Sequence, residues 1–187
     1  MSALVASVAP AASVAPAASV APAASVAPAA LVAEQALHIV VRVGDERFAF
    51  PVSHVEEALD APVVEWVPMA PAGMLGQVPH RGRMVGAWDA GWAFRLARPA
   101  GAGAALVLRD GPRRVALVVD DVTEMARIEA ADVRPVPSGA DLDGVLAGVC
   151  FSPQGGSALV NVVRVDALAA LCLLVSPRET FVDGMTR

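Results

Sequence analysis

The chain has 187 residues, enough for one ordinary domain or two small ones, and 56% of them are apolar. All 14 basic residues are arginines dispersed along the chain, and the formal net charge is -5, which argues against a surface that follows a phosphate backbone. Both cysteines lie in apolar runs and fit buried free thiols better than a disulfide framework.

The first stretch of the chain is a repeat of low complexity. It carries no charge up to residue 33 and repeats Ala-Ser-Val-Ala-Pro-Ala with a period of six. The regularly spaced prolines break any helix long enough to span a membrane, so we predict no membrane insertion. Ala-x-Ala triplets would suit a signal cleavage site, although the positive n-region is lacking, so secretion stays open. We predict an extended tail over residues 1–35 and a short tail over residues 177–187.

Order is expected to begin near Leu37. Apolar residues alternate along residues 37–43 and again along residues 47–52, which predicts two strands joined by the Gly44-Asp45 turn. Ser53 is a suitable helix N-cap, so we predict a short helical turn over residues 54–59, followed by a proline-rich connection.

Residues 74–89 are the stretch in which we expect the function to lie. Apolar residues flank His80-Arg81-Gly82-Arg83, which predicts two strands joined by a tight turn at Gly82. An arginine at the tip of such a hairpin is a planar, permanently charged fork that suits a carboxylate, on the same protein or on a partner.

The second half of the chain repeats the first. Residues 47–57 and 114–124 match without a gap in their arginine, alternating apolar positions, valine and final glutamate, and residues 148–163 follow the layout of residues 76–89. We therefore predict two similar small β units. Neither is large enough to be stable alone, so we expect them to pack together. Helical turns are expected over residues 92–98, and a helix over residues 165–174 that covers the junction of the units.

Taken in order, these segments resemble the CheW-like domain of bacterial chemotaxis coupling proteins. The similarity rests on residues 43–57, on Leu75-Gly76, on Arg81-Gly82 with the strand that follows to Asp89, and on residues 115–122. It implies an all-β fold with short helices: two SH3-like five-stranded barrels packed together, with a C-terminal helix. The domain is expected over residues 36–176, with a joint between the barrels at about residues 97–103.

The resemblance also implies a function. Members of this family are non-catalytic adaptors without a cofactor, which couple the cytoplasmic tips of chemoreceptors to the regulatory domain of the chemotaxis histidine kinase. The chain is then expected in the cytoplasm, recruited to membrane-associated receptor arrays. Glu57 and Arg81 match a characteristic pair at the receptor-facing surface of the family. Near that pair, the predicted contact residues are Val55, Ala58, Gly82 and Val85.

Two departures from the family pattern lie in the same hairpin. The family usually has Asn-Leu before Arg-Gly, where this chain has Pro79-His80, and Gly86 replaces a proline on the return strand. Because proline cannot donate to a sheet ladder, we predict that the strand ends at Pro79 or lies at an edge. One alternative is therefore a specialised member that binds only one of the two partners.

Other kinds of site are less well supported. Small β-barrels also bind oligonucleotides, but this chain is acidic and has no tyrosine for base stacking. His38, His54 and His80 are too scattered to predict a metal site, and we expect them to be solvated or on strand faces. The neighbouring carboxylates Glu56-Glu57 and Asp120-Asp121 are expected to be solvated cap or turn residues. For Glu57 and Arg81 the competing explanation is an ion pair that only stabilises the fold.

Overall fold

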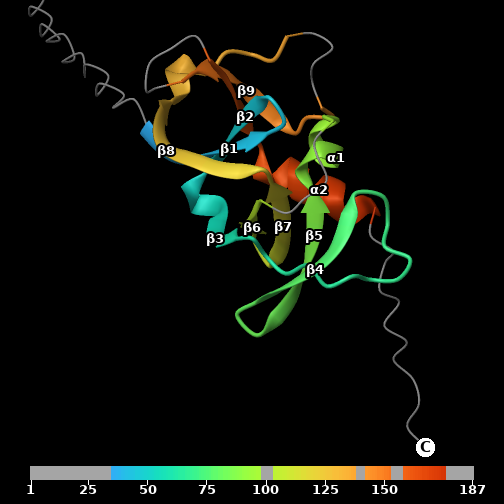
Figure 1. Cartoon of the computed structure of the whole chain (residues 1–187). Coiled ribbons are helices and arrows are strands. Elements are labelled where there is room, and N and C mark those ends of the chain that lie inside the picture. Colours follow the sequence, from blue (N-terminus) through green and yellow to red (C-terminus); the bar gives the residue numbers. More distant parts are fainter. Residues whose placement is uncertain (1–34, 98–102, 138–141, 153–157, 176–187) are drawn as a thin grey trace, which may run out of the picture. The chain divides into compact units, whose positions relative to one another are not determined.

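Alternating apolar residues form strands through most of the described part of the chain, residues 35–97, 103–137, 142–152 and 158–175 of the computed structural model (Figure 1). The two predicted tails lie outside these ranges, apart from the last residue of the first one, and stay predictions. In chain order, the elements are β1 (Gln35–Val43), β2 (Glu46–Pro51), the 3-10 helix η1 (Val52–His54), β3 (Val55–Asp60), β4 (Met74–His80), β5 (Arg83–Asp89), α1 (Ala90–Phe94), β6 (Ala104–Asp110), β7 (Arg113–Val119), β8 (Asp121–Glu129), the 3-10 helix η2 (Ala130–Asp132), β9 (Leu146–Phe151), β10 (Leu159–Val163) and α2 (Val165–Val175).

The strands form two five-stranded sheets, each curled around apolar side chains of its own. The first, here barrel A, has the order β8-β1-β2-β10-β9, and the second, barrel B, has the order β3-β6-β7-β5-β4. Neighbouring strands are antiparallel except for β2 with β10 and β5 with β7. The predicted fold class, two five-stranded β units with short helices and a C-terminal helix, is confirmed.

The internal repeat is real, but its two copies are interleaved. Matching β1–β5 to β6–β10 in order converts the strand order of barrel A into that of barrel B. Each barrel therefore takes two strands from one copy and three from the other. The chain crosses between barrels at η1 and again at Asp120, within the two segments that match in sequence. The predicted joint at residues 97–103 is wrong as a boundary, because β5 and β6 on either side of it both belong to barrel B.

The predicted helical turn over residues 54–59 is also wrong. Residues 55–59 lie in β3, which pairs antiparallel with β6, whereas His54 and Ser53 lie in η1, which has no side-chain cap. Pairing with β6 satisfies the backbone of this segment and overrides the local helix-start signal. The other predicted turn is present but earlier: α1 begins after Asp89, whose carboxylate accepts a hydrogen bond from Gly91 N at 3.0 Å.

The predicted hairpin is formed by β4 and β5. Its two-residue turn is Arg81-Gly82, with positive φ at both residues, 46° and 75°, as the twist of a tight hairpin requires. β4 is an edge strand of barrel B, so Pro79 removes no hydrogen bond that an inner strand would need. The prediction of an edge position for Pro79 is confirmed.

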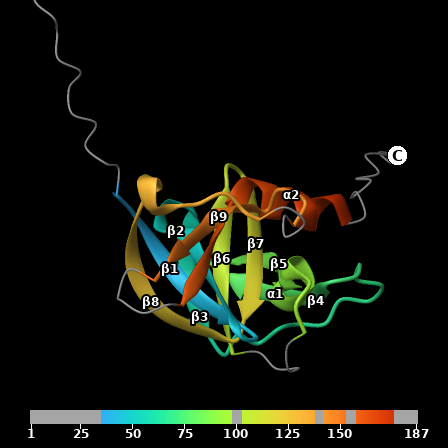
Figure 2. The ribbon, with the colours of Figure 1, turned by 90° about the horizontal axis from the view of Figure 1, so that it is seen from above.

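The core has three parts. One small cluster fills each barrel, and the largest cluster lies between the barrels, where α1 and α2 join it (Figures 1 and 2). Along β7, Val115, Leu117 and Val119 face the central cluster, and Ala116 and Val118 face the inside of barrel B. Burial on both faces explains the continuous apolar runs of such strands. No helix within the described ranges has the length and apolar character to cross a membrane.

Two glycines at equivalent positions in the repeat let the preceding connection approach the sheet. A Cβ on Gly76 would lie 2.2 Å from the carbonyl oxygen of Glu65, and one on Gly148 would lie 2.4 Å from that of Arg134. Each connection pairs with the residue that follows the glycine, Glu65 with Gln77 and Arg134 with Val149. The repeated glycine is therefore required by a backbone contact that both barrels make.

We expect Gly148→Ala to lower the free energy of unfolding by at least about 2 kcal/mol, because backbone must move to accept the methyl group. Gly86→Ala is the matched control, since its methyl would meet only side-chain ends, 3.3 Å from Trp88 Nε1 and 3.4 Å from Met74 Cε. Urea unfolding of both variants measures the difference. Equal losses would show that the close approach to Arg134 does not constrain the fold.

Candidate functional site

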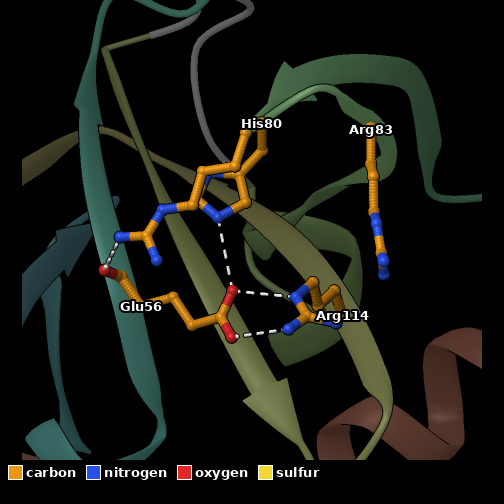
Figure 3. Close-up of a pocket in the computed structure, with 5 residues that line it drawn as sticks. Glu56, His80, Arg83 and Arg114 are labelled. Carbon is orange, nitrogen blue, oxygen red and sulfur yellow. Dashed lines mark hydrogen bonds and ion pairs between the residues drawn. The ribbon is translucent and has the colours of Figure 1, made fainter.

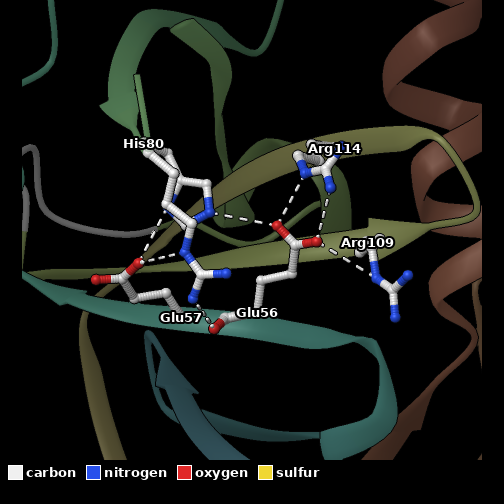
Figure 4. A network of polar contacts seen from close by, with 6 residues as sticks. Glu56, Glu57, His80, Arg109 and Arg114 are labelled. Atoms are coloured by element: carbon white, nitrogen blue, oxygen red, sulfur yellow. Dashed lines mark hydrogen bonds and ion pairs between the residues drawn. The ribbon is translucent and has the colours of Figure 1, made fainter. Parts of the chain in front are cut away.

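Side chains at one end of barrel B join its two edge strands. β3 and β4 are the outer strands of this sheet, and within the described residues no backbone ladder joins them. His80, the last residue of β4, reaches across instead: its Nε2 lies 3.3 Å from Glu56 Oε2 and its Nδ1 lies 3.1 Å from Glu57 Oε2 (Figure 4). The contact of Nε2 with Glu56 is a hydrogen bond, and the contact of Nδ1 with Glu57 is an ion pair when the ring is protonated. This histidine closes the barrel through side chains.

A β-bulge explains why two consecutive glutamates reach the same histidine. The register with β6 passes from Val55 opposite Leu108 to Glu57 opposite Val107, so Glu56 is an extra residue in the ladder. Bulges of this kind re-aim side chains that would otherwise point to opposite faces. The result is a pair of carboxylates facing the β4–β5 turn.

The expected ion pair between Glu57 and Arg81 is present at the surface. Arg81 Nε lies 3.7 Å from Glu57 Oε2, and its Nη2 donates to the carbonyl oxygen of Glu56 at 3.5 Å. The side chain of Arg81 is 67% exposed and that of Glu57 is 42% exposed. Most of the guanidinium therefore remains available to another molecule.

Glu56 is the centre of a second, less exposed set of contacts. Arg114 donates to both of its carboxylate oxygens, at 2.8 and 2.9 Å, and Arg109 Nε lies 3.3 Å from Oε1 (Figures 3 and 4). The bidentate bond from Arg114 is the main reason that the pKa of Glu56 lies below its ordinary value, and the contact with His80 acts in the same direction. The same bond raises the pKa of Arg114. The carboxylate is therefore held in its charged form.

This lowered pKa gives a pH dependence with a defined sign. The contribution of Glu56 to stability is complete above the pKa of the unfolded chain, and it is lost as the pH falls through the lower value of the folded state. We expect the unfolding free energy of the wild type to fall more steeply below about pH 4.5 than that of Glu56→Gln. Urea unfolding between pH 3 and 7 tests this, and parallel curves for the two proteins would contradict it.

The other predicted contact residues differ in their exposure. Gly82 and Ala58 are exposed beside the Glu57–Arg81 pair, whereas Val55 is partly buried against the central core. The prediction for Val85 is wrong as a direct contact, because the residue is 4% exposed and packs inside barrel B. Its place on β5 faces it inward, toward Val78 of β4.

Sequence reasoning missed most of the network behind the pair. His80 does lie on a strand face, one of the two predicted environments, but on the buried face of β4, with its side chain 3% exposed. Glu56 was expected to be a solvated cap or turn residue, and its side chain is 13% exposed. A signal for His80 existed in the alternation along β4, which points Gly76, Val78 and His80 to one side. No comparable signal identified Arg109 and Arg114, which come from a distant hairpin.

The described residues contain no group of three or more His, Cys, Asp or Glu side chains that could hold a metal ion. The site is instead a set of ion pairs among arginine, histidine and glutamate, and its chemistry is that of recognition by charge.

Comparison with protein families gives one match, the CheW-like domain, over residues 38–171. The chain belongs to the CheW-like family. Among solved structures, the scaffolding protein TtCheW from Thermoanaerobacter tengcongensis is similar in fold, with a TM-score of 0.62 and 16% sequence identity, covering 70% of this chain and 85% of that chain. Comparison with curated proteins gives no match.

CheW-like proteins are non-catalytic scaffolds of chemotaxis, so this chain is a scaffold or adaptor and not an enzyme. In this CheW-like chain the pair predicted from the resemblance, Glu57 and Arg81, lies at the β4–β5 turn of barrel B. His80, one of the predicted departures from the family pattern, contacts Glu57 of this pair.

Proposed function

We propose that the chain couples the signalling tip of a chemoreceptor to the regulatory domain of the chemotaxis histidine kinase. The observation that carries the proposal is the exposed Glu57–Arg81 pair, which a CheW-like chain presents at the β4–β5 turn. The left-handed backbone of Arg81 and the hydrogen bond to the Glu56 carbonyl hold the guanidinium in place before a partner arrives. Such preorganisation reduces the entropy lost on binding.

The kinase domain, in this proposal, binds elsewhere, on an apolar strand surface. A suitable surface is available on the β9–β10 hairpin of barrel A, where Phe151 and Leu159 are cross-strand neighbours and are 66% and 55% exposed. Two separate surfaces allow a scaffold to hold both partners at once. We further propose that the chain acts in the cytoplasm at receptor arrays, and that residues 1–35 add reach to the domain at 36–176.

The experiment that tests the proposal is a pair of binding titrations with the full chain, against a receptor signalling tip and against the kinase regulatory domain of the same organism. Saturable binding to both is expected. Binding to only one would support the alternative of a specialised member, in which Pro79-His80 has altered one surface. Binding to neither would contradict the proposal.

A further inference from the structure

The end of barrel B that contains the β4–β5 turn has more arginines than carboxylates to neutralise them. The cation cluster, as we name it, consists of Arg81, Arg83, Arg109 and Arg114. Among the described residues, the carboxylates that pair with these arginines are Glu56 and Glu57. This local excess of two positive charges, before any charge on His80, contrasts with a chain whose net charge is -5. A local field of opposite sign to the whole protein is a feature of surfaces that attract a charged partner.

Comparing the two copies of the internal repeat shows which arginines of the cation cluster have counterparts in barrel A. Arg109 and Arg114 are opposite each other on β6 and β7, and Arg42 and Arg47 occupy the same positions on β1 and β2 of barrel A. In barrel A these two are balanced by Asp120 and Glu124, at 3.5 and 4.0 Å.

The surplus comes from the β4–β5 turn. His80 and Arg83 are cross-strand neighbours there, and their counterparts in barrel A are Ser152 and Ala158, which are joined by a backbone hydrogen bond of 2.9 Å. Barrel A therefore forms without a cation at the Arg83 position. The arginine at this place in barrel B is free to serve recognition.

Arg83 is in position to receive an acidic group. It lines an open hollow of about 250 Å³ together with Glu56, His80, Arg81 and Arg114. Within the described residues it has no ion pair, and Figure 3 shows it apart from Glu56, with no contact to the residues drawn. Because the neighbouring guanidinium groups are already paired, the unpaired guanidinium of Arg83 is suited to bind a carboxylate from another molecule. The carboxylate oxygens would accept hydrogen bonds from its planar set of N–H groups.

We propose that the cation cluster binds acidic side chains of the protein partner, with Arg83 as the residue that receives a carboxylate. This inference rests on the proposed function, because it adds Arg83 to the proposed receptor-binding surface around the Glu57–Arg81 pair. The recognised feature is a protein segment that carries aspartate or glutamate next to the residue that meets Arg81. Such contacts raise the association rate and weaken with salt.

The test measures binding of the full chain to a receptor signalling tip at low and at raised salt. We expect Arg83→Glu to bind about tenfold more weakly at low salt and to lose part of the salt dependence of the wild type. Arg127→Glu is the matched control, an exposed arginine on β8 of barrel A with no ion pair in the described ranges, and should bind within about twofold of the wild type. Unchanged unfolding midpoints show that both variants fold.

The outcomes separate the two proposals. No binding by the wild type overturns the proposed function itself. Normal binding by the wild type, with Arg83→Glu unaffected at every salt concentration, overturns the cation cluster and leaves the proposed function standing. A single-stranded oligonucleotide serves as a second probe, and tighter binding of it through Arg83 would show that the surface takes phosphates, contrary to the inference.

Discussion

Replacing Arg81 with alanine is expected to weaken binding of a receptor signalling tip by at least about 30-fold, which corresponds to roughly 2 kcal/mol, the size of an interface hot spot. The side chain is 67% exposed and its pair with Glu57 lies at the surface, so its loss removes a recognition group without removing core packing. An exposed ion pair of this kind contributes only about 0 to 1 kcal/mol to folding.

Isothermal titration with the full chain measures this loss, with Arg127→Ala as the control for removal of an exposed arginine from the other barrel. Urea unfolding of the same samples measures stability. If Arg81→Ala bound as tightly as the wild type, the pair would only stabilise the fold. A parallel fall in binding and stability would point to the same conclusion.

Replacing Phe94 with alanine is expected to lower the free energy of unfolding by about 3–5 kcal/mol. The ring is 2% exposed and stacks on Phe48, with centroids 3.9 Å apart and planes 9° from parallel. Phe48 belongs to barrel A and Phe94 to α1, which lies in the chain between β5 and β6 of barrel B, so the cavity would open in the core that joins the barrels. Such a loss is a large part of the total stability of an ordinary domain.

Phe151→Ala makes the same chemical change on the surface, where the ring is 66% exposed, and is expected to cost less than about 0.5 kcal/mol. Urea denaturation followed by tryptophan fluorescence compares the two variants. Similar losses for both would mean that the central core between the barrels does not hold them together.

Local patterns in the sequence predicted most strands but not their partners. The alternation along residues 37–43 and the turn at Arg81-Gly82 are local signals, and the structure has β1 and the β4–β5 hairpin at those places. The repeat was also visible, yet a repeat does not say which copy pairs with which. The interleaved order depends on the crossings at η1 and Asp120. At each crossing the chain leaves a strand of one barrel and enters a strand of the other. Only long-range burial decides that arrangement.

The same distinction applies to the site. The Glu57–Arg81 pair was predicted from the family resemblance, and the two side chains do meet. The carboxylate of Glu56 was missed because the bulge that turns it toward His80 arises from the register of β3 with β6, which no local pattern encodes. Val85 was predicted as a contact because of its proximity to that pair, but strand alternation places it on the inner face.

Size-exclusion chromatography of the full chain, mixed with both the receptor signalling tip and the kinase regulatory domain, tests whether this chain bridges the two partners. We expect one complex that contains all three proteins, because the Glu57–Arg81 surface on barrel B and the Phe151–Leu159 surface on barrel A are separate. Two mutually exclusive pairwise complexes, or binding of one partner alone, would contradict it.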